Sequence, residues 1–329
     1  MRAVAAGWTG VAHRGQDRAG GSWVVRDRCL NFLRAPMRLD FPMKIFYHQC
    51  ATPNVGDDIN AHLWPAILGD ALAASPYDWL VGIGTILDER ILRLDGEVLV
   101  AGAGVRPGKR RLELPSRVTI CAVRGPLSAA NLGLSEDLVG CDPGFFVRNL
   151  GFQKTTVSGR TGFVPHIYSE QNTTIAAVVR NAGFHVISPM SDHRVFLGEL
   201  VTCERVFTES LHGAIFADAL RIPWARVKVS SHYREREAVS DFKWEDAFRH
   251  LACATSAANS RPRARERGDL RPLRPLLGWY YALTERRLIA ELSGLAADPS
   301  VFRLSDEALL AERLRRFEAR LLAMLRQRR

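Results

Sequence analysis

The sequence predicts an α/β protein in which two doubly wound, Rossmann-like domains face a cleft, followed by a helical C-terminal tail. Short apolar runs alternate with segments of helical periodicity, a pattern typical of parallel sheets that are covered on both faces. A polar stretch at 148–162, which carries Gly and Thr, separates two such series. Residues 1–42 show no clear period, and we predict a disordered extension there.

The first domain is expected at 43–150. Three of its apolar runs lead directly into glycine turns, which marks the carboxyl ends of strands. The loop at 54–60 leads into helical spacing, and a short helix is expected after Pro126. The predicted strands lie at 43–47, 79–85, 98–101, 118–123 and 138–140.

The second domain is expected at 160–258 and repeats the alternation. Gly183 is predicted to end its first helix, and Pro223 stands just after the helix that Ser210 begins. Strands are predicted at 163–165, 185–188, 205–208 and 224–229, and helices at 172–182, 195–203, 210–220 and 244–253.

Residues 259–329 are predicted to form a linker and an amphipathic helical tail. The linker, 259–275, is rich in Arg and Pro, and Leu276–Leu292 is amphipathic. Ser305 can cap a last helix. That helix is expected to dock on its own domain, and the alternatives are pairing in a coiled coil and binding to a membrane surface. The apolar residues of that helix are Leu310, Leu314, Phe317, Leu321 and Met324.

Composition indicates a cytoplasmic globular protein. The 329 residues are 47% hydrophobic, and no stretch approaches the roughly 18 apolar residues of a membrane span. The six cysteines show no C-x-x-C spacing, which favours a reducing compartment and argues against a zinc site. We therefore expect neither a metal nor a cofactor.

The net charge of +10 belongs to the two ends of the chain. Residues 1–42 carry seven arginines against three acidic residues, and residues 261–329 carry sixteen against nine. Basic ends can attract an anionic membrane surface or nucleic acid. The sequence lacks aromatic-interleaved basic strands of the RNA-binding kind, so we expect no nucleic-acid partner. Peripheral attachment to the inner face of the membrane through these ends stays an open alternative.

The segment Thr208–Leu220 is the strongest candidate site. A short strand turns at once into a helix that Ser210 can cap, so His212 falls in the first helical turn. Unpaired N–H groups of such a turn favour an anion and disfavour a charged imidazole until the anion arrives. His212 is therefore a candidate proton donor to an anionic substrate, and local capping or packing is the alternative.

Other candidate residues follow predicted strand ends. Arg106 and Arg124 can grip a carboxylate or a phosphate, and His166 can add a donor. Of the adjacent Asp57 and Asp58, one is expected to cap a helix and the other to act as a base toward a hydroxyl.

The glycine turns do not form a dinucleotide fingerprint. Pro107 stands where the third glycine after Gly102 and Gly104 should be. The turn at Gly82, Gly84 and Thr85 is instead expected to allow close backbone approach, either to a ligand or to a helix.

An ordered set of motifs over about 43–230 resembles the polysaccharide pyruvyl transferases, and within them the bacterial exopolysaccharide ketal pyruvyl transferases. The matching segments are Asn54-Val55-Gly56-Asp57-Asp58-Ile59-Asn60, Gly82-Ile83-Gly84-Thr85-Ile86-Leu87, Val123-Arg124-Gly125-Pro126, Gly140-Cys141-Asp142-Pro143, Val164-Pro165-His166 and Thr208-Glu209-Ser210-Leu211-His212-Gly213-Ala214-Ile215-Phe216-Ala217-Asp218-Ala219.

The resemblance implies a GT-B-like fold and transfer of the pyruvyl group of phosphoenolpyruvate to two hydroxyls of one sugar. The product is a cyclic ketal, phosphate is released, and the acceptor is a lipid-linked oligosaccharide. On this interpretation His212 is the general acid, and Asp57 or Asp58 is the base. Two alternatives are a nucleotide-sugar glycosyltransferase on the same fold and a basic-tailed, non-enzymatic protein of a surface-polysaccharide assembly complex. The expected donor-binding residues are Arg124, Arg106, Ser210, His166, Gly82, Gly84 and Thr85.

Overall fold

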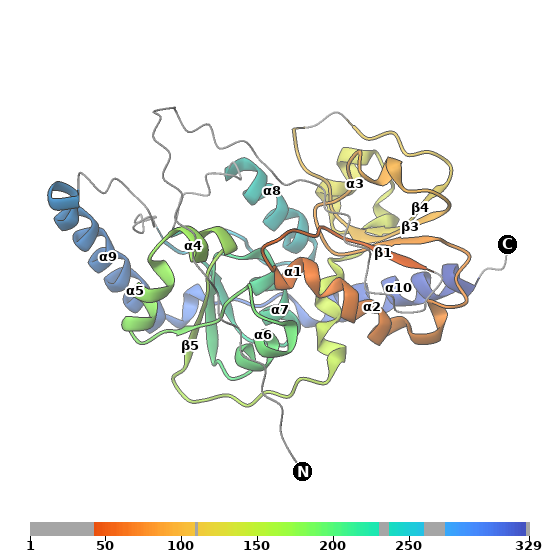
Figure 1. The fold of residues 1–329 in the computed structure, drawn as a ribbon. Coiled ribbons are helices and arrows are strands. Elements are labelled where there is room, and N and C mark those ends of the chain that lie inside the picture. The colour runs from red at the N-terminus through yellow and green to blue at the C-terminus, as the bar shows by residue number, and fades with distance from the viewer. Residues whose placement is uncertain (1–42, 109–110, 230–236, 260–273, 327–329) are drawn as a thin grey trace, which may run out of the picture. The chain divides into compact units, whose positions relative to one another are not determined.

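Two parallel four-stranded sheets organise the chain (Figure 1). The computed structural model describes residues 43–108, 111–229, 237–259 and 274–326, all within one compact unit. The predicted extension at 1–42 and most of the predicted linker lie outside the described residues. The parallel α/β class predicted from the sequence is therefore confirmed.

The first sheet has the order β1-β2-β3-β4. Its side chains alternate between two apolar cores: Leu80 and Leu99 point into one, and Val81 and Val100 into the other. Burial on both faces explains why these strands are continuous apolar runs. The strands are β1 (Lys44–Phe46), β2 (Trp79–Val81), β3 (Val98–Ala103) and β4 (Val118–Val123).

Helices cover both faces of the first sheet. Residues of α2, the 3₁₀ helix η4 and the last helix α10 share the core on one face, and α3 contributes to the core on the other. The helices and 3₁₀ turns of this half are α1 (Val55–Asp58), α2 (Asn60–Leu68), η1 (Gly69–Ala71), η2 (Ile91–Arg93), α3 (Pro126–Leu132), η3 (Glu136–Leu138) and η4 (Pro143–Leu150).

The second sheet has the order β6-β5-β7-β8. The order reverses between β5 and β7, so this sheet is doubly wound and its switch point lies at the carboxyl ends of those two strands. Helices α6 and α7 pack on one face, and α5 and α9 on the other. The elements are β5 (Thr161–Val164), α4 (Ile167–Asn172), α5 (Ile175–Asn181), β6 (His185–Val186), α6 (His193–Leu200), β7 (Arg205–Thr208), α7 (Leu211–Ala219) and β8 (Trp224–Arg226).

Three local predictions need correction. The first sheet shows no reversal of strand order, so only the second is doubly wound. The segment predicted as a fifth strand makes a single bridge, between Val123 and Val139. The helix predicted at 172–182 is α5, which starts three residues later at Ile175, and the separate short helix α4 before it was not predicted. Between the two, the Thr173 hydroxyl accepts a hydrogen bond from the N–H of Ile175 at 3.2 Å.

The tail crosses back to the first sheet. Helix α10 buries Leu310, Leu314, Phe317 and Leu321 as predicted, but Leu325 in place of Met324. Its docking on its own chain is thereby confirmed. The cap differs, because the Asp306 carboxylate accepts the N–H of Leu309 at 2.9 Å. The remaining elements are α8 (Glu237–Phe248), η5 (Arg249–Leu251), α9 (Arg274–Ala297), η7 (Pro299–Val301) and α10 (Glu307–Arg326).

Ser305, the predicted cap, has another role. It is buried, and its hydroxyl and N–H both donate to the Asp218 carboxylate of α7. Trp224 donates to the same carboxylate at 2.8 Å. Asp218 therefore fastens the start of the tail to the second sheet. Within the described ranges, no helix combines the length and apolar character needed to cross a bilayer.

Candidate functional site

The turn between β7 and α7 is held from both sides. Ser210 caps α7 as predicted, its hydroxyl accepting the N–H of Gly213 at 3.4 Å. The buried Glu209 carboxylate accepts the N–H groups of His166 at 3.2 Å and Val229 at 3.1 Å. These bonds tie the end of β7 to the segments that follow β5 and β8. The first turn of α7 is therefore a fixed platform at the switch point of the second sheet.

His212 lies on this platform and is 15% exposed. Its ring stacks on Phe216 at a centroid distance of 5.8 Å. On another side lies the backbone of Gly56, where a Cβ atom would stand only 1.9 Å from Nδ1. Burial first, then the nearby Arg124 and Lys243 charges, lowers the pKa of His212 to about 3. The imidazole is therefore neutral near pH 7.

Asp142 faces the other ring nitrogen of His212. Its Oδ2 atom is 4.0 Å from His212 Nε2, and both atoms are buried without a hydrogen-bond partner in the described part of the chain. Oδ1 accepts the N–H of Gly144 at 2.9 Å and so starts η4. Burial raises the pKa of Asp142 to about 6, and Arg124 opposes that rise. Sequence reasoning assigned Asp142 no role, although it lies in one of the quoted motifs.

Arg124 is buried at the carboxyl end of β4, with 1% of its surface exposed. Its Nε donates to Asp246 at 2.9 Å, and Nη1 donates to the Thr85 hydroxyl at 3.0 Å. Gly104 makes room for the guanidinium, since a Cβ there would lie 2.4 Å from Cζ. Nη2 is buried and has no hydrogen-bond partner among the described residues. The guanidinium is thus fixed with one nitrogen left to bind something else.

Asp246 holds Arg124 in this position from helix α8. Its carboxylate also accepts the N–H and the hydroxyl of Ser128, at 2.8 and 2.6 Å. The two charged residues are 122 positions apart in the sequence. No local pattern connects them, which is why sequence reasoning did not find Asp246.

The adjacent aspartates of α1 have different surroundings. Asn54 caps α1, and the Asp58 carboxylate accepts the backbone N–H of Asn54 at 2.8 Å. Asp57 accepts the Asn54 side-chain amide at 2.6 Å and faces the turn at Gly84, where a Cβ would lie 3.5 Å from its Oδ1. Burial raises the pKa of Asp57 to about 7, against the opposing effects of Asn54 and Lys243. The cap of α1 is therefore Asn54 and neither aspartate, contrary to the prediction. Asp58 bonds the N–H of that cap, and Asp57 is the carboxyl that faces the turn at Gly84.

Two further cations act on these groups, and neither was predicted. Lys243 of α8 lowers the pKa values of both Asp57 and His212. Arg90 also lowers the pKa of Asp57, while it pairs with Asp88 at 2.8 Å. Arg124, Lys243 and Arg90 thus bring positive charge to the carboxyl side of the first sheet. Such a group of cations suits a small ligand with more than one negative charge.

The glycine turn at the end of β2 mainly allows the close approach of helix α2. A Cβ on Gly82 would lie 2.4 Å from Trp64 Nε1 and 2.5 Å from Asn60 Oδ1. Asn60 is buried and pairs with both the N–H and the C=O of Ile83, at 2.9 and 3.2 Å. Gly84 turns the chain with φ +131°. Of the two expected uses of this turn, close approach to a helix is the one that Gly82 serves.

For two further predicted donor-binding residues, a role in binding the donor stays a prediction. Arg106 is exposed and lies just after β3. His166 uses Nδ1 to accept the N–H of Tyr168 at 3.2 Å and caps α4.

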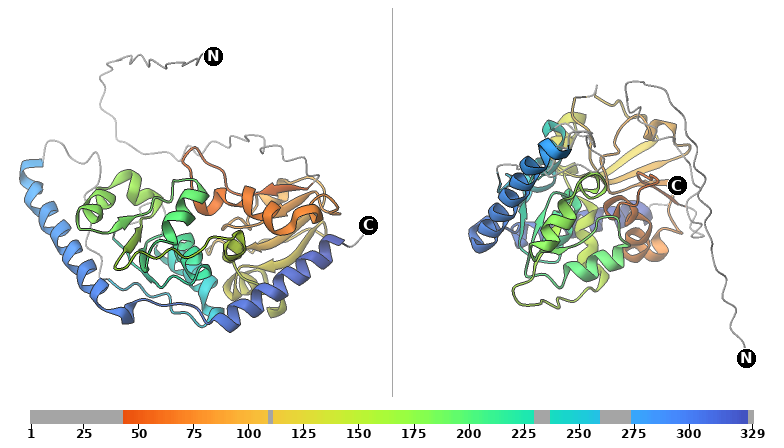
Figure 2. Two further views of the ribbon diagram at one scale, coloured as in Figure 1. Left: turned by 90° about the horizontal axis from the view of Figure 1, so that it is seen from below. Right: turned by 60° about the vertical axis from the view of Figure 1, so that its left-hand side comes forward.

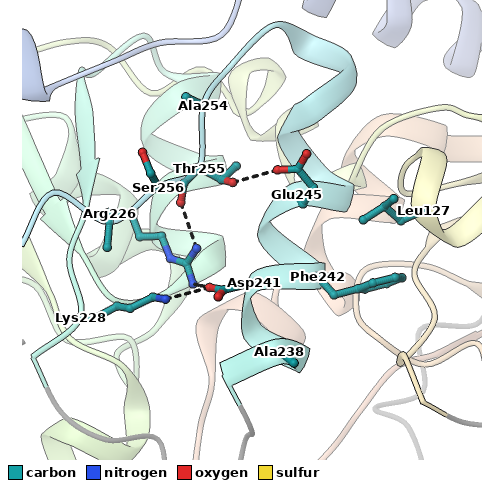
Figure 3. Close-up of a pocket in the computed structure, with 11 residues that line it drawn as sticks. Leu127, Arg226, Lys228, Ala238, Asp241, Phe242, Glu245, Ala254, Thr255 and Ser256 are labelled. Carbon is teal, nitrogen blue, oxygen red and sulfur yellow. Dashed lines mark hydrogen bonds and ion pairs between the residues drawn. The ribbon is translucent and has the colours of Figure 1, made fainter.

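A separate open pocket of about 780 Å³ lies on another face of α8 (Figure 3). Asp241 accepts hydrogen bonds there from Arg226 at 2.5 Å and Lys228 at 2.9 Å. None of the predicted site residues lines it. In the described ranges, no three His, Cys, Asp or Glu side chains are grouped so as to hold a metal ion.

Comparison with known proteins gives one informative relative. No family model matches the chain, and no solved structure matches it. The succinoglycan biosynthesis protein ExoV of Rhizobium meliloti (strain 1021) is 34% identical over 206 residues. The match takes in 62% of this chain and spans 63% of the length of that protein. This similarity to a polysaccharide biosynthesis protein supports the resemblance of the ordered motifs to the exopolysaccharide pyruvyl transferases.

Proposed function

We propose that the protein transfers the pyruvyl group of phosphoenolpyruvate to two hydroxyls of one sugar in an exopolysaccharide repeat unit. One observation carries the proposal: Arg124 Nη2, His212 Nε2 and Asp142 Oδ2 are buried in one cluster without partners among the described residues. Buried polar atoms are rarely left unsatisfied unless a ligand or a reaction uses them. The similarity to a succinoglycan biosynthesis protein supports a polysaccharide acceptor.

The donor fits the charges of the cluster. Phosphoenolpyruvate carries a phosphate and a carboxylate, and Arg124 and Lys243 offer two separate cations. The N–H groups of the first turn of α7, after Ser210, can donate hydrogen bonds to a phosphate oxygen. In this arrangement Arg124 binds an oxygen of the donor through Nη2, because its other nitrogens are already occupied by Asp246 and Thr85.

His212 is the proposed general acid. The reaction begins when a proton moves from the acid to the methylene carbon, so that positive charge develops at the neighbouring carbon. In the protein alone the imidazole is neutral, because burial and two cations lower its pKa to about 3. A bound phosphate dianion offsets Arg124 and Lys243 and raises that pKa. Binding of the anionic donor thus raises the pKa of His212 and favours the protonated imidazole, which is the form that can act as the acid.

Asp142 is the proposed positioning residue for that acid. A carboxylate that faces His212 Nε2 stabilises the charged imidazole once the ring is protonated. Asp142 stays at a fixed place because its other oxygen accepts the N–H of Gly144. Because the backbone of Gly56 lies against Nδ1, Nε2 is the atom that gives the proton to the donor. Asp142 acts on the charged ring across 4.0 Å without taking that proton.

Asp57 is the proposed base. The first sugar hydroxyl attacks the cationic carbon and gives up its proton, which Asp57 can accept because its pKa is about 7. The bond from that carbon to the phosphate oxygen then breaks, and the second hydroxyl attacks the same carbon. The two hydroxyls lose two protons in all. One restores the proton that His212 gave to the methylene group, and the other leaves on the phosphate.

A phosphate-release assay tests the proposal. Purified full-length protein is mixed with phosphoenolpyruvate, with lipid-linked oligosaccharide, or with both. Phosphate release only with both substrates, together with an acceptor mass gain that equals one pyruvyl ketal, is the expected result. Turnover of a nucleotide sugar with the same acceptor would instead identify a glycosyltransferase.

A further inference from the structure

Helix α9 has two unlike halves. Its C-terminal half buries Leu288 and Leu292 in the core beneath the second sheet. Its N-terminal half exposes Trp279 to 68%, Leu283 to 45% and Tyr280 to 43%. Figures 1 and 2 show this end of α9 extending away from the second sheet. Three large apolar side chains are therefore exposed within five residues. We call the surface formed by Trp279, Tyr280 and Leu283 the α9 aromatic face.

The exposed side chains follow one line along the helix. Trp279 and Leu283 are four residues apart, and the exposed Arg286 and Arg287 follow at the same helical spacing. The opposite side, with Thr284 and Leu288, is buried. The solvent side of α9 thus carries aromatic, aliphatic and cationic side chains together. Tryptophan, tyrosine and arginine are the residues that settle at the boundary between lipid headgroups and acyl chains.

The sequence around the α9 aromatic face is strongly basic. Residues 260–273, which precede the helix directly, carry five arginines against two acidic residues. Anionic lipid attracts such a segment by about 1 kcal/mol for each basic residue near the surface. Helix α10 differs, because its apolar row is buried in the protein core: Leu310, Leu314, Phe317, Leu321 and Leu325.

We propose that the α9 aromatic face docks on an anionic lipid bilayer, with Trp279 and Leu283 inserted among the headgroups and Arg286 and Arg287 against lipid phosphates. The proposal places the membrane contact on a defined helix face. It does not depend on pyruvyl transfer. Docking of this kind would keep the protein at the surface where lipid-linked saccharides are made and used.

Vesicle co-sedimentation of the full chain tests the proposal. One set of vesicles is pure phosphatidylcholine, and the other is an equimolar mixture of phosphatidylcholine and phosphatidylglycerol. We expect binding to the mixed vesicles only, and weaker binding at high salt. The double variant Trp279→Ser/Leu283→Ser should bind the mixed vesicles at least about tenfold more weakly, since two apolar side chains no longer leave water.

A matched variant controls for the loss of any exposed apolar pair. Val195 and Leu309 are exposed to 53% and 42% on other helices, and Val195→Ser/Leu309→Ser should bind like the unchanged protein. Circular dichroism and light scattering accompany each sample. Equal binding by both double variants, or no binding by the unchanged protein, would overturn the proposal. So would a dimer that dissociates only in Trp279→Ser/Leu283→Ser, because the face would then be an interface between copies.

Discussion

The polar side chains at the carboxyl ends of the two sheets differ in how firmly other residues of the protein hold them. At the first sheet, Arg124 is fixed by Asp246 and Thr85, and Asp58 by the backbone of Asn54. At the second sheet, the ring of His212 touches Phe216 and the backbone of Gly56, but its Nε2 has no hydrogen bond to any described residue. Arg124, which is proposed to bind the donor, is thus held in place before a ligand arrives. His212, the proposed acid, has no hydrogen-bond partner for Nε2 among the described residues until a ligand binds. Four predictions separate the contributions of the two sheets.

The largest effect is expected at the second sheet. His212→Gln should lower kcat by about 10²–10⁴-fold while the protein stays folded, because a positioned general acid contributes that much. His193→Gln is the matched control, since His193 also lies in the first turn of a capped helix but stacks on His62 instead. The kcat for phosphate release and the thermal midpoint are measured for both. A near-normal kcat in His212→Gln would remove the acid assignment.

The paired aspartates separate chemistry from capping. Asp57→Asn should lower kcat by about 10²-fold or more, as loss of a base does. Asp58→Asn should leave kcat nearly unchanged, because the Asp58 carboxylate bonds the backbone N–H of Asn54, a contact that the Asn side-chain oxygen can keep. In the unchanged protein, kcat/KM should rise with pH through about 7, because this ratio reports the ligand-free protein, in which Asp57 must lose its proton before it can act. The Asp57→Asn variant should lose that rise, and a profile shared by both proteins would exclude Asp57 as the base.

A glycine pair tests the contact between the two sheets. Gly56→Ala should reduce kcat/KM on the order of a hundredfold, since the added Cβ would stand 1.9 Å from the imidazole and must displace it. Gly198→Ala is the control, because nothing lies within 4 Å of a Cβ at this helical position. It should keep full activity and gain about 0.5–1 kcal/mol of stability. If Gly56→Ala stays fully active, the position of the ring is not critical.

The smallest effect is expected from the fixed cation. Arg124→Lys should raise KM for phosphoenolpyruvate by about 10- to 100-fold with less change in kcat, because a charged hydrogen bond is worth roughly 1.5–3 kcal/mol. Arg226→Lys is the control for the loss of a buried, ion-paired arginine, since Arg226 pairs with Asp241 near the separate pocket. Initial rates at varied donor concentration distinguish the two variants. Equal rises in KM would mean that Arg124 acts only through stability.

Local signals in the sequence predicted the second half of the site better than the first. The strand, the Ser210 cap and the position of His212 follow from spacing within a dozen residues. Asp246 and Lys243 could not be predicted, because on α8 they look like ordinary charges of an exposed helix. The short helix α4 was not predicted, because its six residues are too few and too polar to show an apolar period.

The return of α10 to the first sheet has a consequence during protein synthesis. Phe317 packs against Phe146, and Leu321 lies in the same core as Cys121 of β4. The ribosome completes β4 roughly 200 residues before it completes α10, an interval of about 10–40 s at ordinary elongation rates. Until then one face of the nascent first sheet lacks one of the helices that cover it. This interval is where we expect the emerging chain to need chaperones most.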